Sequence, residues 1–358
     1  MAYYTLGGAN KTILKLYMKH ITIIAFFIST LVSGQIGIKS LDEALKNPNK
    51  VTHLNLSYQN LKSIPESISR LKNLTSLSLS HNNLDSLPKS IVKLKKLKVL
   101  ILGSNAFKTY PEIINNLENL ENLDIGYLDL KVIPNTIGKL KRIKILRLKG
   151  NNLISLPESL GSLEALETLD LESNQLTSLP SSIGNLSRLQ SLLISSNKLN
   201  NLPNSFTKLV NLKVLLASYN SYNQMPELVT QLQGLELLSF EGNQLTSLPK
   251  TIGNLIKLQR LLLKDNKLKE VPSSIDKLHQ LKLLNLSYNE LTNLPKSFGN
   301  ITNLERLNLK SNQLSDLPMS IENLINLKVL NLSRNPIYKN SEKLDELKSK
   351  LPKCSFSI

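Results

Sequence analysis

The sequence is poor in the residues that cross-link a chain or carry it across a membrane. Its 358 residues include no tryptophan, one cysteine, four histidines and 27 acidic against 44 basic residues. A single cysteine excludes a scaffold held by internal disulfides. Only residues 21–32 form a continuously apolar run, which excludes a membrane protein with several spans. Leucine and isoleucine recur throughout, so disorder is also excluded.

Proline recurs with a fixed period. Twelve of the fifteen prolines lie 23 residues apart, without insertion or deletion. They are Pro65, Pro88, Pro111, Pro134, Pro157, Pro180, Pro203, Pro226, Pro249, Pro272, Pro295 and Pro318. A period of this length is typical of a solenoid, in which each unit covers the apolar edge of its neighbour.

A ladder of asparagines has the same period, six residues before the prolines. Two units carry Gln59 and Leu128 at this position. The other members are Asn82, Asn105, Asn151, Asn174, Asn197, Asn220, Asn243, Asn266, Asn289, Asn312 and Asn335. A buried carboxamide can satisfy backbone groups of two adjacent turns, so we expect a structural role. At Leu128 the ladder must break, and we expect a weaker unit or a bound water there.

Each unit follows the pattern L-x-x-L-x-L-x-x-N-x-L-x-x-L-P-x-x-I-x-x-L-x-x. In one unit the pattern residues are Leu166, Leu169, Leu171, Asn174, Leu176, Leu179, Pro180, Ile183 and Leu186. This resembles the leucine-rich repeat family, in the 23-residue subclass of Ras-binding and Scribble-type scaffolds, and bacterial secreted leucine-rich repeat proteins. The resemblance covers thirteen units, residues 51–335.

The repeat predicts an α/β fold. In L-x-L both leucines point inward and the residue between them points outward, as in a strand. After the proline the apolar spacing becomes three, which suits a 3₁₀ or short helical return. Stacked units predict a right-handed, horseshoe-shaped solenoid. Its concave face is a parallel sheet about 60 Å along the arc, given about 4.8 Å per strand.

The ends of the chain differ from the repeats. Residues 1–34 resemble a signal peptide, with Met18 as an alternative start. We expect an N-terminal helical cap over 35–50, the repeats over 51–335, and a C-terminal cap of helix plus strand over 336–358. The favoured localisation is therefore secreted, cell-surface or periplasmic; an uncleaved apolar arm on a cytoplasmic protein is the alternative.

Two details support the caps. Ser40 with Glu43 forms a capping box, which predicts the start of a helix. Cys354 alternates with Phe356 and Ile358 in the C-terminal tail, so we interpret it as a small buried apolar side chain rather than a nucleophile or ligand.

Partner specificity must lie in the outward residues of the concave strands. Most are polar, but aliphatic residues gather in the seventh to eleventh units, with a tyrosine at two strand exits. Such a patch is typical of a protein or peptide binding site, although aliphatics on a sheet face can also simply support the strand. The predicted partner-binding residues are Leu193, Val214, Leu216, Tyr219, Leu237, Leu262, Leu283 and Tyr288.

The favoured function is a non-catalytic recognition module that binds a protein or peptide on its concave face. One alternative is an intracellular signalling scaffold, as the resemblance to the Ras-binding subclass implies. Another is a surface adhesion protein that binds anionic glycan. We expect no enzymatic activity, cofactor or metal, because no nucleophile–histidine pair, metal-ligand spacing or phosphate loop is present.

Charge gives further expectations. The net charge of +17 is spread over loops and the convex side, so we expect no nucleic-acid partner. The apolar run 21–32 is too short to cross a bilayer, so we expect no stable membrane span. In the fourth to sixth units we expect Asp124, Arg147 and Asp170 to face one another across strands, and Lys149 to face Glu172, as opposite charges that stabilise the sheet. A charged ligand site or a catalytic pair of carboxylates is the alternative.

Overall fold

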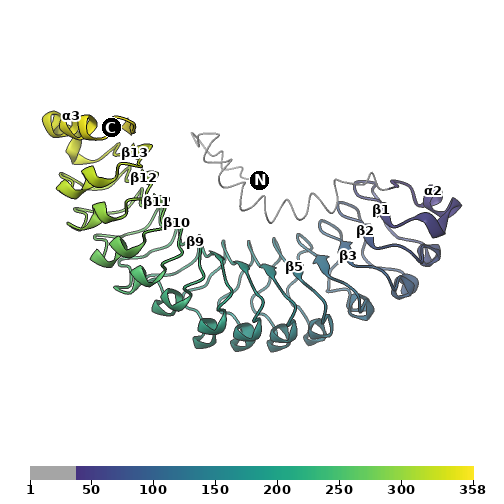
Figure 1. Cartoon of the computed structure of the whole chain (residues 1–358). Coiled ribbons are helices and arrows are strands. Elements are labelled where there is room, and N and C mark those ends of the chain that lie inside the picture. Colours follow the sequence, from purple (N-terminus) through teal and green to yellow (C-terminus); the bar gives the residue numbers. More distant parts are fainter. Residues whose placement is uncertain (1–37) are drawn as a thin grey trace.

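The described part of the chain is a single open solenoid. The structure, a computed structural model, describes residues 38–358; the signal peptide predicted for residues 1–34 lies outside this range. Short parallel strands line the concave side and 3₁₀ helices line the convex side, as Figure 1 shows. The described residues form one fourteen-stranded sheet whose strand order follows the sequence. The predicted horseshoe-shaped α/β solenoid is confirmed.

Every strand is three residues long, and strands β1 to β13 begin 23 residues apart. Their bounds are β1 His53–Asn55, β2 Ser76–Ser78, β3 Val99–Ile101, β4 Asn122–Asp124, β5 Ile145–Arg147, β6 Thr168–Asp170 and β7 Ser191–Leu193, then β8 Val214–Leu216, β9 Leu237–Ser239, β10 Arg260–Leu262, β11 Leu283–Asn285, β12 Arg306–Asn308, β13 Val329–Asn331 and β14 Ser355–Ser357. The middle residue of β1 to β13 is a leucine at most 2% exposed, so the first and third residues face the concave side.

The return from each of β1 to β13 passes through a 3₁₀ helix, and one further 3₁₀ helix precedes β1. These helices are Pro48–Lys50, Glu66–Arg70, Lys89–Lys93, Glu112–Asn116, Asn135–Lys139, Glu158–Ser162, Ser181–Asn185, Asn204–Lys208, Glu227–Gln231, Ile252–Asn254, Ser273–Lys277, Phe298–Asn300, Met319–Asn323 and Pro336–Lys339. Most begin directly after the repeat proline, whose fixed φ suits the turn. The carbonyl of Pro65, for example, accepts from the backbone N–H of Ile68 at 3.1 Å.

The asparagine ladder runs inside the solenoid and joins neighbouring turns. The Nδ2 of Asn174 donates to the carbonyls of Leu148 and Leu171, both at 3.0 Å. Its Oδ1 accepts from the backbone N–H of Leu153 at 3.1 Å. One carboxamide thus satisfies backbone groups from two units, and the predicted structural role is confirmed.

The two units without a ladder asparagine close the turn with an extra left-handed residue. One residue at each strand exit has a positive φ, but Asn60 (55°) and Asp129 (56°) are additional cases. They directly follow Gln59 and Leu128. The backbone N–H of Leu128 then donates to Asn151 Oδ1 at 3.1 Å, and its side chain is 2% exposed. The next ladder residue, Asn151, therefore satisfies the N–H of Leu128, while the predicted weaker unit or bound water stays a prediction.

The two ends carry different elements. Helix α2 (Leu41–Lys46) starts at Ser40, whose Oγ accepts from the backbone N–H of Glu43 at 3.4 Å, and Ile38 bridges to Leu54 of β1. At the other end, helix α3 (Ser341–Lys350) buries Leu344 and Leu347, and β14 pairs with β13. From residue 38 onward, the chain has no helix whose length and apolar character would let it cross a membrane.

Candidate functional site

The six predicted aliphatic residues lie on one face of the sheet. Each occupies the first or third position of a strand between β7 and β11. Leu193 is in register with Leu216, and Val214 with Leu237. None of the six belongs to the cluster of inward side chains that forms the core. Leu216 and Leu283 are partly buried. The structure therefore brings the predicted aliphatics together on the concave side.

Polar residues interrupt this row of aliphatics. Ser239 of β9 lies between Leu216 and Leu262, and Arg260 of β10 lies between Leu237 and Leu283. The patch is thus a mosaic of two aliphatic pairs and two flanking leucines. A mosaic of this kind offers apolar contact and polar recognition side by side.

The sequence overestimated how exposed these side chains are. Leu193 and Val214 are 8% exposed, Leu237 is 9% exposed and Leu262 is 3% exposed; Leu216 and Leu283 are half-buried. Side chains in register on neighbouring strands lie about 4.8 Å apart and shield each other, and the concave curvature brings them closer still. The prediction of a broadly exposed apolar patch is therefore wrong for four of the six aliphatics.

Both predicted tyrosines stand out at the strand exits. Tyr219 is 56% and Tyr288 40% exposed. The ring of Tyr219 lies over Gly242 of the next unit, where a Cβ would overlap it. The ring of Tyr288 lies between the ammonium groups of Lys264 and Lys310, at 5.4 and 5.7 Å from its centroid. Both rings offer an apolar body and a polar hydroxyl to a partner.

Two further tyrosines at the same repeat position were not among the predicted site residues. Tyr127 is 56% exposed and lies over Gly150, as Tyr219 lies over Gly242. Tyr58 is 73% exposed and stacks on His81, with ring centroids 4.2 Å apart. Comparing the strand-exit position across units would have found them.

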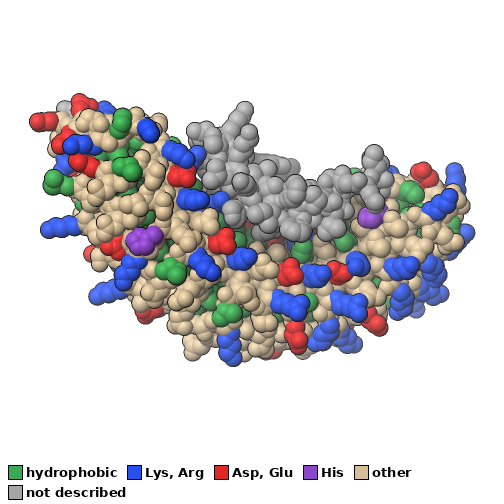
Figure 2. Space-filling model, viewed as in Figure 1, with side chains coloured by type: hydrophobic (Ala, Val, Ile, Leu, Met, Phe, Trp, Pro, Cys, Tyr) green, Lys and Arg blue, Asp and Glu red, His purple; other side chains and the backbone are tan. Residues whose placement is uncertain are grey.

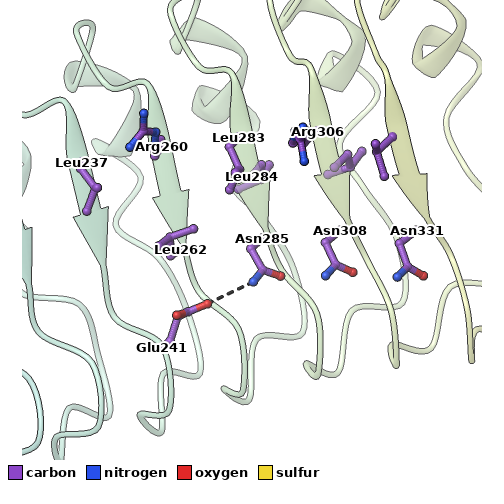
Figure 3. A pocket seen from close by; sticks show the side chains of 12 residues that line it. Leu237, Glu241, Arg260, Leu262, Leu283, Leu284, Asn285, Arg306, Asn308 and Asn331 are labelled. Carbon is purple, nitrogen blue, oxygen red and sulfur yellow. Dashed lines mark hydrogen bonds between the residues drawn. The ribbon is translucent and has the colours of Figure 1, made fainter. Parts of the chain in front are cut away.

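A hollow of about 150 Å³ lies on the concave face over β9 to β13, drawn in Figure 3. It contains three predicted residues: Leu237, Leu262 and Leu283. Its other lining residues are Glu241, Arg260, Leu284, Asn285, Arg306, Leu307, Asn308, Val329 and Asn331. Sequence reasoning placed several of these in the outward rows but did not connect them to the aliphatic patch.

The charged region of β4 to β6 differs from the expected arrangement. Asp124, Arg147 and Asp170 are in register, but within residues 38–358 no ion pair of 4 Å or less joins them. Asp124 Oδ1 instead accepts from the backbone N–H of Gly126, and Asp170 Oδ1 from that of Glu172, both at 3.0 Å. The predicted row of opposite charges is confirmed, and both carboxylates favour the charge of Arg147; a direct ion pair does not form, because each carboxylate caps its own turn.

Burial shapes the protonation of this region. Arg147 is 9% exposed; its Nη1 donates to Asn122 Oδ1 at 3.2 Å, and its Nη2 has no partner. Burial raises the pKa of Asp170 to about 6. The second predicted pair is confirmed, because Lys149 Nζ lies 2.7 Å from Glu172 Oε2. Burial opposes the charge of Lys149, but the bond to Glu172 outweighs it and raises the lysine pKa.

Groups suited to metal binding or nucleophilic chemistry are sparse. In the part of the chain that the structure describes, no three histidine, cysteine or acidic side chains gather as metal ligands would. Cys354 packs against the edge of the core, and burial raises its pKa to about 11. Its sulfur is therefore a thiol rather than a thiolate at neutral pH, as a structural residue would be.

Basic side chains are spread over the outer surface. Figure 2 shows lysine and arginine along the whole visible face, most densely over the N-terminal repeats. Lys93, Lys95 and Lys96 in the outer loop after β2, and Lys141 and Arg142 two units later, are all exposed. Several donate to neighbours, as Lys96 Nζ does to Asn73 Oδ1 at 2.7 Å. No single basic stripe runs along the concave strands that the structure describes.

Comparisons with known proteins cover nearly all of the described chain. A family model described as "Leucine-rich repeat region" matches residues 40–143, 129–239 and 229–354. A leucine-rich repeat protein of Leptospira interrogans is 34% identical in sequence. The match covers 90% of this chain and 100% of that one, with a TM-score of 0.62. None of the curated proteins compared with the chain matches it.

Two further solved structures extend the comparison. A plant peptide hormone receptor, RGFR1 in complex with RGF2, is 29% identical with a TM-score of 0.63; the match covers 80% of this chain but only 52% of the receptor. An internalin from Listeria monocytogenes is 23% identical, with a TM-score of 0.68 and coverage of 82% of this chain and 88% of that one. The internalin supports the fold alone.

Proposed function

We propose, from the premise that the chain belongs to the leucine-rich repeat family, that it is a recognition module. Leucine-rich repeat proteins are typically non-catalytic, and their folds commonly mediate protein or peptide recognition. The proposed partner is a protein or peptide that binds the concave face of β7 to β11. The proposed contacts are those of Leu193, Val214, Leu216, Tyr219, Leu237, Leu262, Leu283 and Tyr288.

The observation that carries this proposal is the mosaic of β7 to β11. Aliphatic side chains lie outside the core on the concave side, although an outward position in water favours polar residues. Exposed tyrosines flank them at the strand exits, at 56% and 40% exposure for Tyr219 and Tyr288. Aromatic and aliphatic anchors within a polar surround are the usual composition of a binding hot spot. The plant receptor in the comparison has a peptide hormone as its ligand.

The test is a selection of peptides from a random display library on the purified protein, followed by fluorescence anisotropy. The variant Leu216→Gln plus Leu262→Gln should lower the affinity for selected peptides at least 30-fold, because it removes two apolar anchors without adding charge. Ile101→Gln in β3 is the matched control; Ile101 occupies the same strand position and is half-buried. Unchanged binding by the double variant, with folding intact, would contradict the proposed site.

A second candidate function rests on the exposed basic loops of the N-terminal repeats. Lys93, Lys95 and Lys96 would attract an anionic glycan, as expected of a surface adhesion protein. Heparin serves as the probe, and binding that weakens steeply with ionic strength favours this candidate. Binding of uncharged peptides to the apolar mosaic should change little over the same salt range.

We also propose export, with residues 1–34 removed. The apolar run 21–32 follows Lys11, Lys15 and Lys19, and no acidic residue precedes Asp42, which is the usual pattern of a signal peptide. Mass spectrometry of the native protein should find a mature N-terminus near Gln35. A chain that retains residues 18–34 would favour the intracellular signalling scaffold instead.

A further inference from the structure

Three asparagines form an outward row at the C-terminal end of the sheet. Asn285, Asn308 and Asn331 occupy the third position of β11, β12 and β13 and are in register. They belong to the concave face and are half-buried, unlike the ladder asparagines inside the solenoid. Figure 3 shows the three carboxamides side by side, with the nitrogen of each on the same side.

A backbone bond fixes the orientation of each carboxamide. Asn285 Oδ1 accepts from the N–H of Ser287 at 3.2 Å, and Asn308 Oδ1 accepts from that of Lys310 at 3.1 Å. Asn331 does the same with the N–H two residues later, at 3.0 Å. Within a carboxamide only the oxygen accepts from an N–H, because the NH₂ group is a donor. The side chain must therefore turn its NH₂ group toward the hollow.

The NH₂ group of Asn285 already donates a hydrogen bond to a carboxylate. Asn285 Nδ2 donates to Glu241 Oε1 at 3.1 Å, across a separation of 44 residues. Within residues 38–358 the NH₂ groups of Asn308 and Asn331 have no acceptor. Arg306, on the same strand as Asn308, is half-buried and forms no ion pair with any described residue. This end of the concave face therefore presents hydrogen-bond donors without acceptors.

The surrounding charge favours an anion. Arg260 and Arg306 line the hollow, and Lys264 and Lys310 flank Tyr288 beside it; the carboxylate of Glu241 also lines the hollow, and that of Glu236 favours the charge of Arg260. Counting these six groups gives four positive charges minus two negative charges, a net +2. Hydrogen bonds from such donors to a carboxylate are stronger than bonds to a neutral acceptor.

We propose that the amide groups of Asn308 and Asn331, with Arg306, bind a carboxylate of an extended acidic peptide whose neighbouring aliphatic side chain packs on Leu262 and Leu283. This inference rests on the proposed function and specifies its ligand. Leu262 lies two strands from Asn308, about 10 Å, which an extended peptide spans in about three residues. The acid and the aliphatic residue should therefore lie within four residues of each other.

The choice of asparagine over aspartate carries the specificity. At the same strand position, Asp124 and Asp170 make the equivalent bond to a backbone N–H at 3.0 Å. The turn thus accepts either residue. Asparagine turns a donor toward the ligand, whereas aspartate turns a second acceptor toward it and repels an acid. An acidic peptide should accordingly favour β11 to β13 over β4 to β6.

The experiment compares the wild type with the variant Asn308→Asp plus Asn331→Asp. Peptides from the random library are labelled, and their affinities are measured by fluorescence anisotropy. Selected peptides should carry Asp or Glu near an aliphatic residue and bind the variant at least 30-fold more weakly. The matched control is Asn55→Asp in β1, which makes the same backbone bond, to Ser57 N–H at 3.0 Å, outside the hollow. It should change the affinity less than twofold.

Changes in the peptide show whether the bound carboxylate belongs to a side chain or to the C-terminus. Replacing a side-chain Glu by Gln should weaken binding at least tenfold if the side chain is recognised. Amidating the C-terminus should do so if the terminal carboxylate is recognised. Acidic peptides should also bind more weakly as salt concentration rises, because the guanidinium of Arg306 contributes an electrostatic term.

Other results of these experiments would refute either the acidic-peptide inference or the proposed function. Selected peptides that lack acids and bind the aspartate variant as tightly as the wild type would refute this inference. The proposed function would then still stand if Leu216→Gln plus Leu262→Gln abolished binding. A library that yields no peptide, together with heparin binding that the aspartate variant loses, would identify a glycan as the occupant and refute both statements about peptides.

Discussion

The strands β4 to β6 and β11 to β13 share one interior and carry opposite surfaces. Leucines fill the middle strand position in both, and buried asparagines join the turns beneath them. On the concave side, Asp124 and Asp170 flank Arg147 in the first region, whereas three asparagines stand in a row in the second. The backbone bond at this position is the same in both regions.

This comparison separates what folds the chain from what a partner meets. Inward leucines and ladder asparagines repeat with little change, because each must fill the same space and satisfy the same backbone groups. Outward residues are constrained only to cap a turn or to tolerate a sheet. One residue per unit can therefore change the surface from acidic to donor-rich without altering the solenoid.

The shared interior is broken most severely by removing a ladder asparagine. Asn174→Leu, below β6, and Asn312→Leu, below β12, should each cost about 2 kcal/mol of unfolding free energy. Each leaves one buried backbone N–H, that of Leu153 or Leu291, without its acceptor and removes one of the two asparagine donors from two buried carbonyls. Urea unfolding measures the cost. Equal costs support one interior for both regions.

A second substitution sharpens this test. In the unit with Leu128, a left-handed Asp129 closes the turn. Adding Gln175→Asp to Asn174→Leu should recover part of the lost stability, about 1 kcal/mol, because aspartate tolerates the left-handed conformation. A cost below 1 kcal/mol for Asn174→Leu alone would contradict the role of the ladder.

The surfaces should respond differently to pH. Asp170 has a pKa of about 6 in the folded protein, above its ordinary 3.8, so the folded state binds this proton more tightly than the unfolded state. The wild type therefore loses stability as pH rises through 6. Asp170→Asn keeps the turn bond and should be more stable than wild type by about 1 kcal/mol at pH 7. The difference should disappear near pH 4.

Asp316, a carboxylate whose pKa is lowered rather than raised in the folded protein, serves as the control. The bond to Lys343 lowers the pKa of Asp316, so this group stabilises the fold above its ordinary pKa and loses that effect as pH falls. Asp316→Asn should therefore destabilise the protein slightly at pH 7. An Asp170→Asn variant that is less stable than wild type at pH 7 would contradict the account of its burial.

The smallest effect is expected at the ion pairs. Glu172→Gln breaks the bond to Lys149 and should cost about 0.5 kcal/mol at low salt. Glu305→Gln breaks the bond from Lys328 at 2.7 Å, where the side chains are 35% and 63% exposed, and should cost less. Thermal unfolding at low and high salt measures both. A Glu172→Gln cost that high salt does not reduce would contradict a mainly electrostatic contribution.

Periodicity predicted the solenoid, its parallel sheet and the inward ladder, because these depend on which residues recur at fixed spacing. That the charges of Asp124, Arg147 and Asp170 face one another without a direct ion pair was not predictable in this way. A carboxylate beside Arg147 could bond either to the guanidinium or to its own turn, and only the backbone geometry decides. The prediction that Leu262 is exposed failed for a similar reason, because exposure depends on the curvature of the sheet and on the side chains of neighbouring strands.

The donor row was visible in the sequence only as three polar residues. Asn285, Asn308 and Asn331 could equally have turned their oxygens outward. The backbone N–H two residues later fixes the orientation, and a repeat pattern does not record such a bond. Site prediction in this fold therefore requires the strand-exit geometry as well as the alignment of units.

The absence of tryptophan permits a direct test of where a partner binds. Tyr219→Trp and Tyr127→Trp place a single reporter in equivalent settings, each over a glycine of the next unit. Titration with a selected peptide should shift the emission of the Tyr219→Trp variant, with a midpoint equal to the Kd from anisotropy, and leave the Tyr127→Trp variant unchanged. A shift confined to the Tyr127→Trp variant, or none in the Tyr219→Trp variant while binding persists, would contradict recognition on β7 to β11.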